Sequence, residues 1–125
     1  MKLDKTTAIA RRNEALGTPV LNSDNTLFAV LDSKRSLWWF DVPVAWLRKN
    51  SDFVNLLLHT PDTDKLQHLK VPVRDLRTHQ EKMEVRNAGK RRATISLALS
   101  ADRDSLLRDL RPGGDNLDFS GYRQR

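Results

Sequence analysis

The chain has 125 residues and no cysteine, and its 22 lysines and arginines against 16 aspartates and glutamates give a net charge of +6 at pH 7. This length predicts one domain with one hydrophobic core, and the lack of cysteine excludes disulfides, thiolate nucleophiles and thiolate metal sites. The N-terminus is too polar for a signal peptide, and no apolar run approaches the roughly 18 residues of a membrane span. We therefore expect a soluble, cytoplasmic protein without membrane contact.

The sequence divides into four stretches within one domain. We expect an N-terminal helix in residues 1–17, a linker in 18–26, the folded core in 27–111 and a tail in 112–125. The tail carries a few apolar residues among polar ones, so it either lies against the core as an extended segment or remains mobile.

The expected N-terminal helix has a thin apolar stripe. Ile9 and Leu16 are seven residues apart on one face, and Gly17 is a typical stop residue. Because the stripe is thin, we expect the helix to dock loosely or to be partly disordered. Its N-cap is expected at Thr6 or Thr7. Its solvent-exposed basic residues are expected to be Arg11 and Arg12.

All three tryptophans lie in residues 36–60, SLWWFDVPVAWLRKNSDFVNLLLHT. Residues 37–40 form a short, unbroken aromatic and apolar run, which predicts a buried strand. The residue before a proline prefers extended geometry and proline suits the first position of a helix, so the strand should pass at Pro43 directly into a short helix that ends by residue 49. Residues 53–59 return to strand character.

The same strand-to-helix unit occurs a second time. VPVAWLR at 42–48 and VPVRDLR at 71–77 share five of seven residues at a spacing of 29. Two copies are too few for a solenoid, so we interpret them as one device used twice within a compact domain, the alternative being a chance match. The interpretation predicts a short helix that begins at Pro43 and another that begins at Pro72.

Turn-forming residues between apolar runs predict three hairpins. The paired runs are 27–31 with 37–40, 53–59 with 66–71, and 83–85 with 95–99. A further helix is expected over residues 100–110, with Ser100 as its N-cap. The fold class is therefore α+β: a single domain with an antiparallel sheet of about six strands in hairpins and two to four short helices mainly on one face.

The motifs LWWFDVP, LKVPVRDLR, TISLALS and LRPGG together resemble those of small uncharacterised bacterial proteins carried by mobile gene cassettes, such as the cassettes of integrons. The resemblance covers residues 37–114. No activity is known for such proteins, so the resemblance implies a bacterial origin and supplies no catalytic residues.

No motif predicts a catalytic, cofactor or metal site. His59 and His68 would face each other across the second hairpin like two metal ligands, but nothing supplies a third, so we interpret them as surface or hairpin-pairing histidines. Asp62 and Asp64 resemble the start of a calcium loop whose later ligand positions are occupied by unsuitable residues. A nucleophile elbow and a phosphate-binding loop are absent from the sequence. We expect no enzyme, no cofactor and no bound metal.

The aromatic strand leads to the first functional hypothesis. Adjacent residues of a strand point to opposite faces, so Trp38 and Trp39 need covers on both sides of the sheet. A chain end, a small-molecule pocket or another subunit would supply the second cover, and a symmetric homodimer is the commonest solution. We therefore predict a non-catalytic binding protein that self-associates as a homodimer, and rank a small-molecule-binding domain third. The predicted partner interface consists of Trp38, Trp39 and Phe40.

The second-ranked hypothesis is sequence-nonspecific nucleic-acid binding. Residues 61–100 carry a net charge of +4, and the basic hairpin 86–92 has a tip that reads NAGKRR. Such a tip suits contact with phosphates, although hydrophilic turns are also ordinary solvated surface. The candidate nucleic-acid contacts are Arg74, Arg86, Lys90, Arg91 and Arg92.

Overall fold

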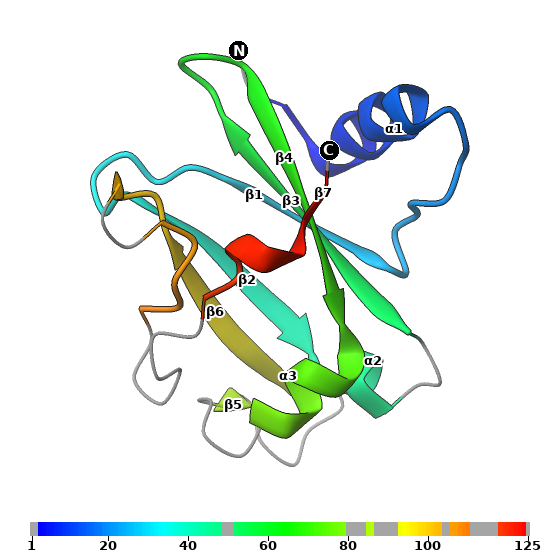
Figure 1. Cartoon of the computed structure of the whole chain (residues 1–125), viewed down its shortest axis with the longest axis vertical. Helices are drawn as coiled ribbons and strands as arrows, with labels where there is room; N and C mark the ends of the chain where they lie inside the picture. The colour runs from blue at the N-terminus through cyan, green and yellow to red at the C-terminus, as the bar shows by residue number, and fades with distance from the viewer. Residues whose placement is uncertain are drawn as a thin grey trace.

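The computed structural model describes residues 3–48, 52–79, 85–86, 93–103, 106–110 and 118–124. The domain is α+β, as predicted, and Figure 1 shows its elements. In chain order they are α1 (Lys5–Leu16), β1 (Thr26–Val30), β2 (Leu37–Pro43), α2 (Val44–Arg48), β3 (Phe53–Thr60), β4 (Lys65–Pro72), α3 (Val73–His79), β5 (Val85–Arg86), β6 (Thr94–Ser100), the 3-10 helix η3 (Ser120–Tyr122) and β7 (Arg123–Gln124).

The strands form two sheets rather than one. One has the order β1-β3-β4-β7 and the other the order β2-β6-β5 (Figure 1). The second and third predicted hairpins are confirmed, since β3 pairs with β4 and β5 pairs with β6 in antiparallel fashion. The first predicted hairpin is wrong: β1 pairs parallel to β3, and β2 pairs along its whole length with β6.

The first hairpin fails because the two runs diverge directly after their turn. Only an isolated bridge between Asp32 and Leu37 joins them. The N–H of Leu31 already donates to the carbonyl of His59 in β3, at 2.9 Å. Because β1 pairs along β3, it does not pair with β2, and β2 pairs instead with β6, which is far along the chain.

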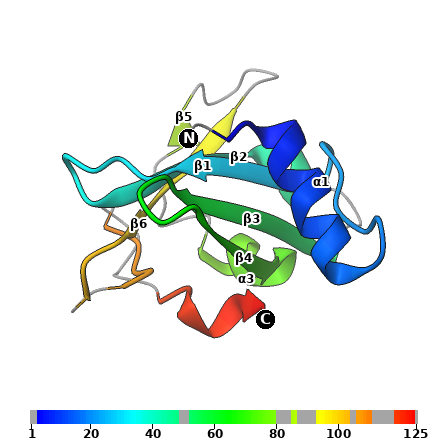
Figure 2. The same cartoon turned by 90° about the horizontal axis from the view of Figure 1, so that it is seen from above.

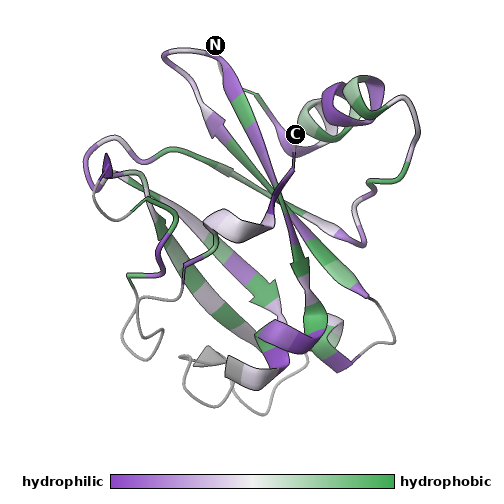
Figure 3. Ribbon diagram, viewed as in Figure 1, coloured by the Kyte–Doolittle hydropathy of each residue, from purple (hydrophilic) through white to green (hydrophobic). Residues whose placement is uncertain are grey.

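The hydrophobic core lies between the two sheets. The inward residues of β2 and β6 alternate with residues on the outer face, which Figure 3 shows as alternating bands along both strands. Each fully buried large apolar side chain contributes on the order of 2 kcal/mol from surface removed from water. The inward residues of these two strands are Trp38, Phe40, Val42, Ile95, Leu97 and Leu99.

Both predicted strand-to-helix junctions are present. Pro43 and Pro72 are the last residues of β2 and β4, and α2 and α3 each begin at the next residue. The first N–H of each helix is bound in the same way, since Val44 donates to Ala93 and Val73 to Asp52, at 2.9 and 3.0 Å. Each acceptor precedes the strand that pairs with the proline's own strand. The internal repeat therefore corresponds to a repeated piece of structure.

The helix predicted over residues 100–110 is wrong. In the described parts, 101–103 and 106–110, there is no α-helix, and the chain instead lies along the edge of β6. Leu110 donates to the carbonyl of Ala98 at 2.8 Å, and Ser100 donates to that of Arg108 at 3.0 Å. Leu107 has a positive φ of 61°, which a helix does not allow. The residues of this segment have a helical pattern, but their backbone groups form hydrogen bonds with the edge of β6 instead of with one another.

The end of the chain lies against the core, one of the two outcomes expected for the tail. Phe119 is fully buried, and its N–H donates to the carbonyl of Leu107 at 2.9 Å. The Tyr122 hydroxyl donates to the Asp75 carboxylate of α3 at 2.7 Å. β7 then pairs with His68 and Leu69 in the middle of β4, so the C-terminal segment, red in Figure 1, passes from the side of β6 to the four-stranded sheet.

Candidate functional site

The site is built where α1 packs on the outer face of the four-stranded sheet (Figure 2). Ala8 and Leu57 are fully buried at this contact, and Leu21 is 4% exposed. Gly17 ends the helix with a φ of 73°, as predicted, but the N-cap is Asp4 rather than a threonine, because its carboxylate accepts the N–H of Thr7 at 2.7 Å. The helix is thus docked firmly instead of loosely.

Arg11 joins α1 to the turn between β3 and β4, and its side chain remains 40% exposed, in line with the prediction that it lies in solvent. The same prediction is wrong for Arg12, whose hydrogen bond to His68 is partly buried. Its guanidinium donates to the Asp64 carboxylate at 2.8 Å and to the Asp64 carbonyl at 2.7 Å. The same carboxylate lies 2.9 Å from Nε2 of His59, which is fully buried. Hydrogen bonds from His59 and Arg11 lower the pKa of the Asp64 carboxyl. Asp64 adopts a φ of 55°, which aspartate tolerates better than most residues.

Arg12 begins a series of hydrogen bonds that crosses the buried face of the sheet. Its Nε donates to Nδ1 of His68 at 3.1 Å. Since Nδ1 accepts, Nε2 of His68 carries the hydrogen and donates to Oδ1 of Asn55 at 2.8 Å. The Asn55 amide group then donates to the carbonyl of Asn25 at 3.3 Å. Each group fixes the orientation of the next.

His68 is held as a neutral imidazole. Burial lowers its pKa to about 4, and the positive charges of Arg12 and Lys70 act in the same direction. His68 is 4% exposed and Asn55 6%. Both polar side chains are therefore nearly buried, with their hydrogen-bonding groups oriented by one another.

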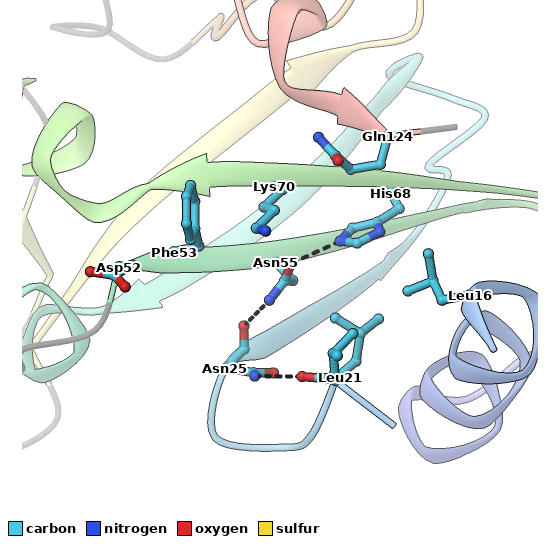
Figure 4. A pocket seen from close by; sticks show the side chains of 10 residues that line it. Leu16, Leu21, Asn25, Asp52, Phe53, Asn55, His68, Lys70 and Gln124 are labelled. Carbon is cyan, nitrogen blue, oxygen red and sulfur yellow. Dashed lines mark hydrogen bonds between the residues drawn. The ribbon is translucent and has the colours of Figure 1, made fainter. Parts of the chain in front are cut away.

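A cavity of about 420 Å³ lies over this surface (Figure 4). Its wall on the α1 side is apolar, and Phe53 lines the other end. Lys70 stands between the two ends, with its ammonium group 4.3 Å from the centre of the Phe53 ring. The apolar lining residues are Leu16, Val20, Leu21 and Phe53, and the polar ones are Asn25, Asp52, Asn55, His68, Lys70 and Gln124.

The polar lining residues differ in how far their hydrogen-bonding groups are already occupied. Both ring nitrogens of His68 are engaged, so neither is available as a general base. The lining residues include no serine, threonine or tyrosine that would serve as a nucleophile. Lys70 forms no ion pair with a carboxylate within the described part of the chain. Its charge is therefore available to an anionic ligand.

The two histidines are placed differently from the prediction. His59 and His68 share one face of the hairpin, but His59 is opposite Leu66 and His68 is opposite Leu57. Both are buried rather than on the surface, and each binds its own partner. Across the described ranges, no three His, Asp or Glu side chains gather in a way that would hold a metal ion.

The predicted partner interface is mostly interior. Trp38 and Phe40 are each 2% exposed in the core, and the indole N–H of Trp38 donates to the carbonyl of His59 at 3.1 Å. These two residues are therefore unavailable to a partner surface. Trp39 points to the opposite face, as strand geometry predicts, and is only half-buried. Its indole N–H donates to the Asp41 carboxylate at 3.1 Å, and Arg35 lies over its ring at 5.7 Å.

The basic residues predicted for nucleic acid are only partly described. The Arg74 side chain is 84% exposed on α3, 3.9 Å from the carboxylate of Asp75. For Arg86 the structure describes the backbone, which pairs with Thr94 in the β5–β6 ladder. Lys90, Arg91 and Arg92 lie outside the described residues, so the role of the hairpin tip stays a prediction.

Sequence reasoning missed the residues that form this cavity. One signal was present: Asn55 interrupts the otherwise apolar start of the run FVNLLL. A polar residue in a buried strand needs a hydrogen-bonding partner, which here is His68. The partner itself was not predictable locally, because it depends on the register of β3 with β4 and on the docking of α1.

The chain matches no family model, no curated protein and no solved structure. The resemblance of residues 37–114 to proteins of mobile gene cassettes stays a prediction. Of the helices in the described parts of the chain, none has the length and apolar character needed to cross a membrane.

Proposed function

We propose that the protein is a non-catalytic binding domain for a small organic anion with an apolar body. The observation that carries the proposal is the cavity of about 420 Å³ whose lining includes the hydrogen-bonded residues His68, Asn55 and Asn25. Arg12 does not line the cavity, but its hydrogen bond to Nδ1 fixes the His68 ring. Binding sites typically combine apolar walls with a few oriented polar groups, and this cavity has both.

The apolar body of the ligand would lie at the α1 end. Leu16, Val20 and Leu21 line this end, and Val20 is 51% exposed while Leu21 is buried. Covering exposed apolar surface with a hydrocarbon segment contributes about 25 cal/mol per Å². A short aliphatic chain therefore suits this wall better than a polar group.

The anionic group would lie beside Lys70. The ammonium group contacts only the face of Phe53 in the described structure, an interaction of about 0.5–1 kcal/mol at an exposed site. A charge-assisted hydrogen bond to a carboxylate is worth about 1.5–3 kcal/mol, so Lys70 is expected to turn toward it. Asp52 marks the far end of the cavity and disfavours an anion there.

Calorimetric titration with hexanoate and with hexylamine tests the proposal. We expect hexanoate to bind and hexylamine, with the same chain and the opposite charge, not to bind. Lys70→Met should weaken hexanoate binding about tenfold or more, because it removes the charge and keeps the apolar stem. Lys65→Met is the matched control, since Lys65 is exposed on the same strand and does not line the cavity. Equal binding of the two probes, or equal losses in the two variants, would contradict the proposal.

Self-association is the second proposed function, now restricted to Trp39. The observation that favours it is the half-buried indole on the outer face of β2, opposite Ala98 of β6. A symmetric pair of molecules would cover this face. Sedimentation equilibrium at tens of micromolar should then show a dimer that Trp39→Lys converts to a monomer. A wild-type monomer over this concentration range rules the dimer out.

A further inference from the structure

A second cavity adjoins the first on the far side of Phe53. Its volume is about 450 Å³, and its lining residues are Asp52, Phe53, Pro72, Arg74 and Arg77. Asp52 and Phe53 line both cavities, so the two hollows meet at the start of β3. The second cavity has a different character, because its wall is basic and nearly free of aliphatic side chains.

Phe53 is an exposed aromatic residue at the centre of this surface. It is 37% exposed, although burial of a phenylalanine side chain is normally favourable. In the sheet it pairs with Pro72, at the end of β4. Lys70 lies over its ring at 4.3 Å, on a long and flexible side chain. The ring is therefore accessible to a flat group that displaces one lysine side chain.

Basic side chains stand on both sides of this ring. Arg74 and Arg77 are three residues apart on α3, a spacing that places them on one helical face, and both line the second cavity. The contact of Arg74 with Asp75 is long and exposed, so it holds the guanidinium weakly. Lys70 lies on the other side, and Asp52 is the single acidic residue among those that line the second cavity. The chain as a whole carries a net charge of +6.

We infer that this surface binds single-stranded nucleic acid without sequence preference. A base would stack on Phe53, while Lys70, Arg74 and Arg77 would contact the flanking phosphates. Aromatic platforms set in basic grooves bind single strands in this way, and each stacked base contributes about 1–3 kcal/mol. A duplex fits less well, because its bases are stacked on one another and do not reach the ring. The inference goes beyond the small-anion proposal: the two surfaces share Asp52 and Phe53 as lining residues and Lys70 as a cationic contact, whereas Arg74 and Arg77 belong to the second cavity alone.

Fluorescence anisotropy with a labelled 15-residue oligothymidylate, measured between 20 and 200 mM salt, tests the inference. We expect Arg74→Gln combined with Arg77→Gln to reduce the log–log salt slope by about 1.4, since each phosphate contact on a single strand contributes about 0.7. Phe53→Leu should weaken binding about fivefold or more at constant slope, because it removes a stacking surface worth about 1–3 kcal/mol and leaves the charges in place. Arg103→Gln is the charge control. Arg103 is exposed and comes shortly after Ser100, the last residue of β6, and it does not line the second cavity.

Three results would each overturn the inference. The first is no binding of the oligonucleotide by the wild-type protein at 20 mM salt. The second is an equal change in slope per charge removed for the Arg74→Gln and Arg77→Gln double variant and for Arg103→Gln, which would indicate attraction by net charge alone. The third is equal binding of polyglutamate with no effect of Phe53→Leu. None of these results decides whether hexanoate binds, because that test uses its own pair of probes and compares Lys70→Met with Lys65→Met, whereas the oligonucleotide test relies on Arg74, Arg77 and Arg103.

Discussion

At the scale of single residues, the binding proposal depends on a histidine that stays neutral. His68 accepts a hydrogen bond from Arg12 and donates one to Asn55, and a protonated ring would lose the first of these bonds. Arg12 would then face a like charge at close range. Burial and two nearby cations therefore hold the pKa of His68 at about 4, below its ordinary value of 6.5.

This lowered pKa predicts a pH dependence of stability. The unfolded chain binds a proton at His68 below about pH 6.5, whereas the folded chain does so only below about pH 4. The unfolded state thus holds more protons between these values, so the free energy of unfolding should fall as the pH is lowered from 6.5 to 4. The loss attributable to this residue is on the order of 2–3 kcal/mol.

Urea unfolding at pH 7, 5.5 and 4.5 measures this loss. His68→Asn keeps a polar side chain at the site and removes the titration, so its stability should change much less across the same range. The Asp64 carboxyl has a lowered pKa and loses stabilising contacts only as the pH falls further. A wild-type protein and a His68→Asn variant with parallel pH profiles would show that His68 is not the titrating group.

At the scale of elements, the sequence predicted well the strand ends, turns and helix ends that depend on neighbouring residues. Pro43 and Pro72 fix the ends of β2 and β4, because the residue before proline is extended and proline has no N–H to continue a strand ladder. The turn between β3 and β4 was predicted from Pro61 and Asp64 for a similar reason. Gly17 ends α1 in the left-handed region, where a side chain is strained.

Elements that depend on distant partners were predicted poorly. The run from Leu106 to Leu110 has a helical pattern, but unpaired donors and acceptors at the edge of β6 hold it in an extended path. The strand at residues 26–30 pairs in parallel with β3, and Phe28 of this strand packs in the cluster under α1. Both partners are distant in sequence, so no local pattern shows them. The cavity was missed for the same reason, since it exists only after α1 docks beside Asn55 and His68.

The end of α1 provides a test of the backbone argument. Gly17→Ala should destabilise the protein by about 1 kcal/mol, because Gly17 has a φ of 73° and alanine is strained there. Gly121→Ala is the matched control, since neither glycine has atoms within 4 Å of an added Cβ and Gly121 has no positive φ. Thermal unfolding of both variants measures the difference. Equal melting temperatures would mean that α1 contributes little to the cooperative fold.

At the scale of the whole molecule, the two faces of the four-stranded sheet have different surroundings. The inner face packs against the β2–β6 sheet and forms the main core. The outer face carries polar residues under α1 and leaves a cavity where the helix ends. The small second cluster around Ala8, Leu21 and Leu57 holds α1 in place, and this cluster therefore also holds the wall of the cavity.

The outer face of β2 and β6 is partly covered by side chains of the same chain. Ser96 and Ser100 are fully buried on this face and Ala98 is 2% exposed, although no helix covers them in the described structure. The Asp41 carboxylate accepts both the Ser96 hydroxyl, at 2.9 Å, and the Trp39 indole N–H, at 3.1 Å. Trp39 is therefore fixed as a partial cover over these small residues, and we assign ligand binding to the cavity below α1 rather than to this face.

The most direct test of the central claim is an NMR titration of the uniformly ¹⁵N-labelled protein with hexanoate. The account predicts progressive shifts of backbone amide signals confined to the cavity, including those of Leu21, Asn55, His68 and Lys70, with the signals of β5 and β6 unchanged. It also predicts that hexylamine leaves the cavity signals in place. Hexanoate shifts spread evenly over the protein, or centred on Trp39 and the outer face of β2, would contradict the claim that the cavity beneath α1 is the binding site.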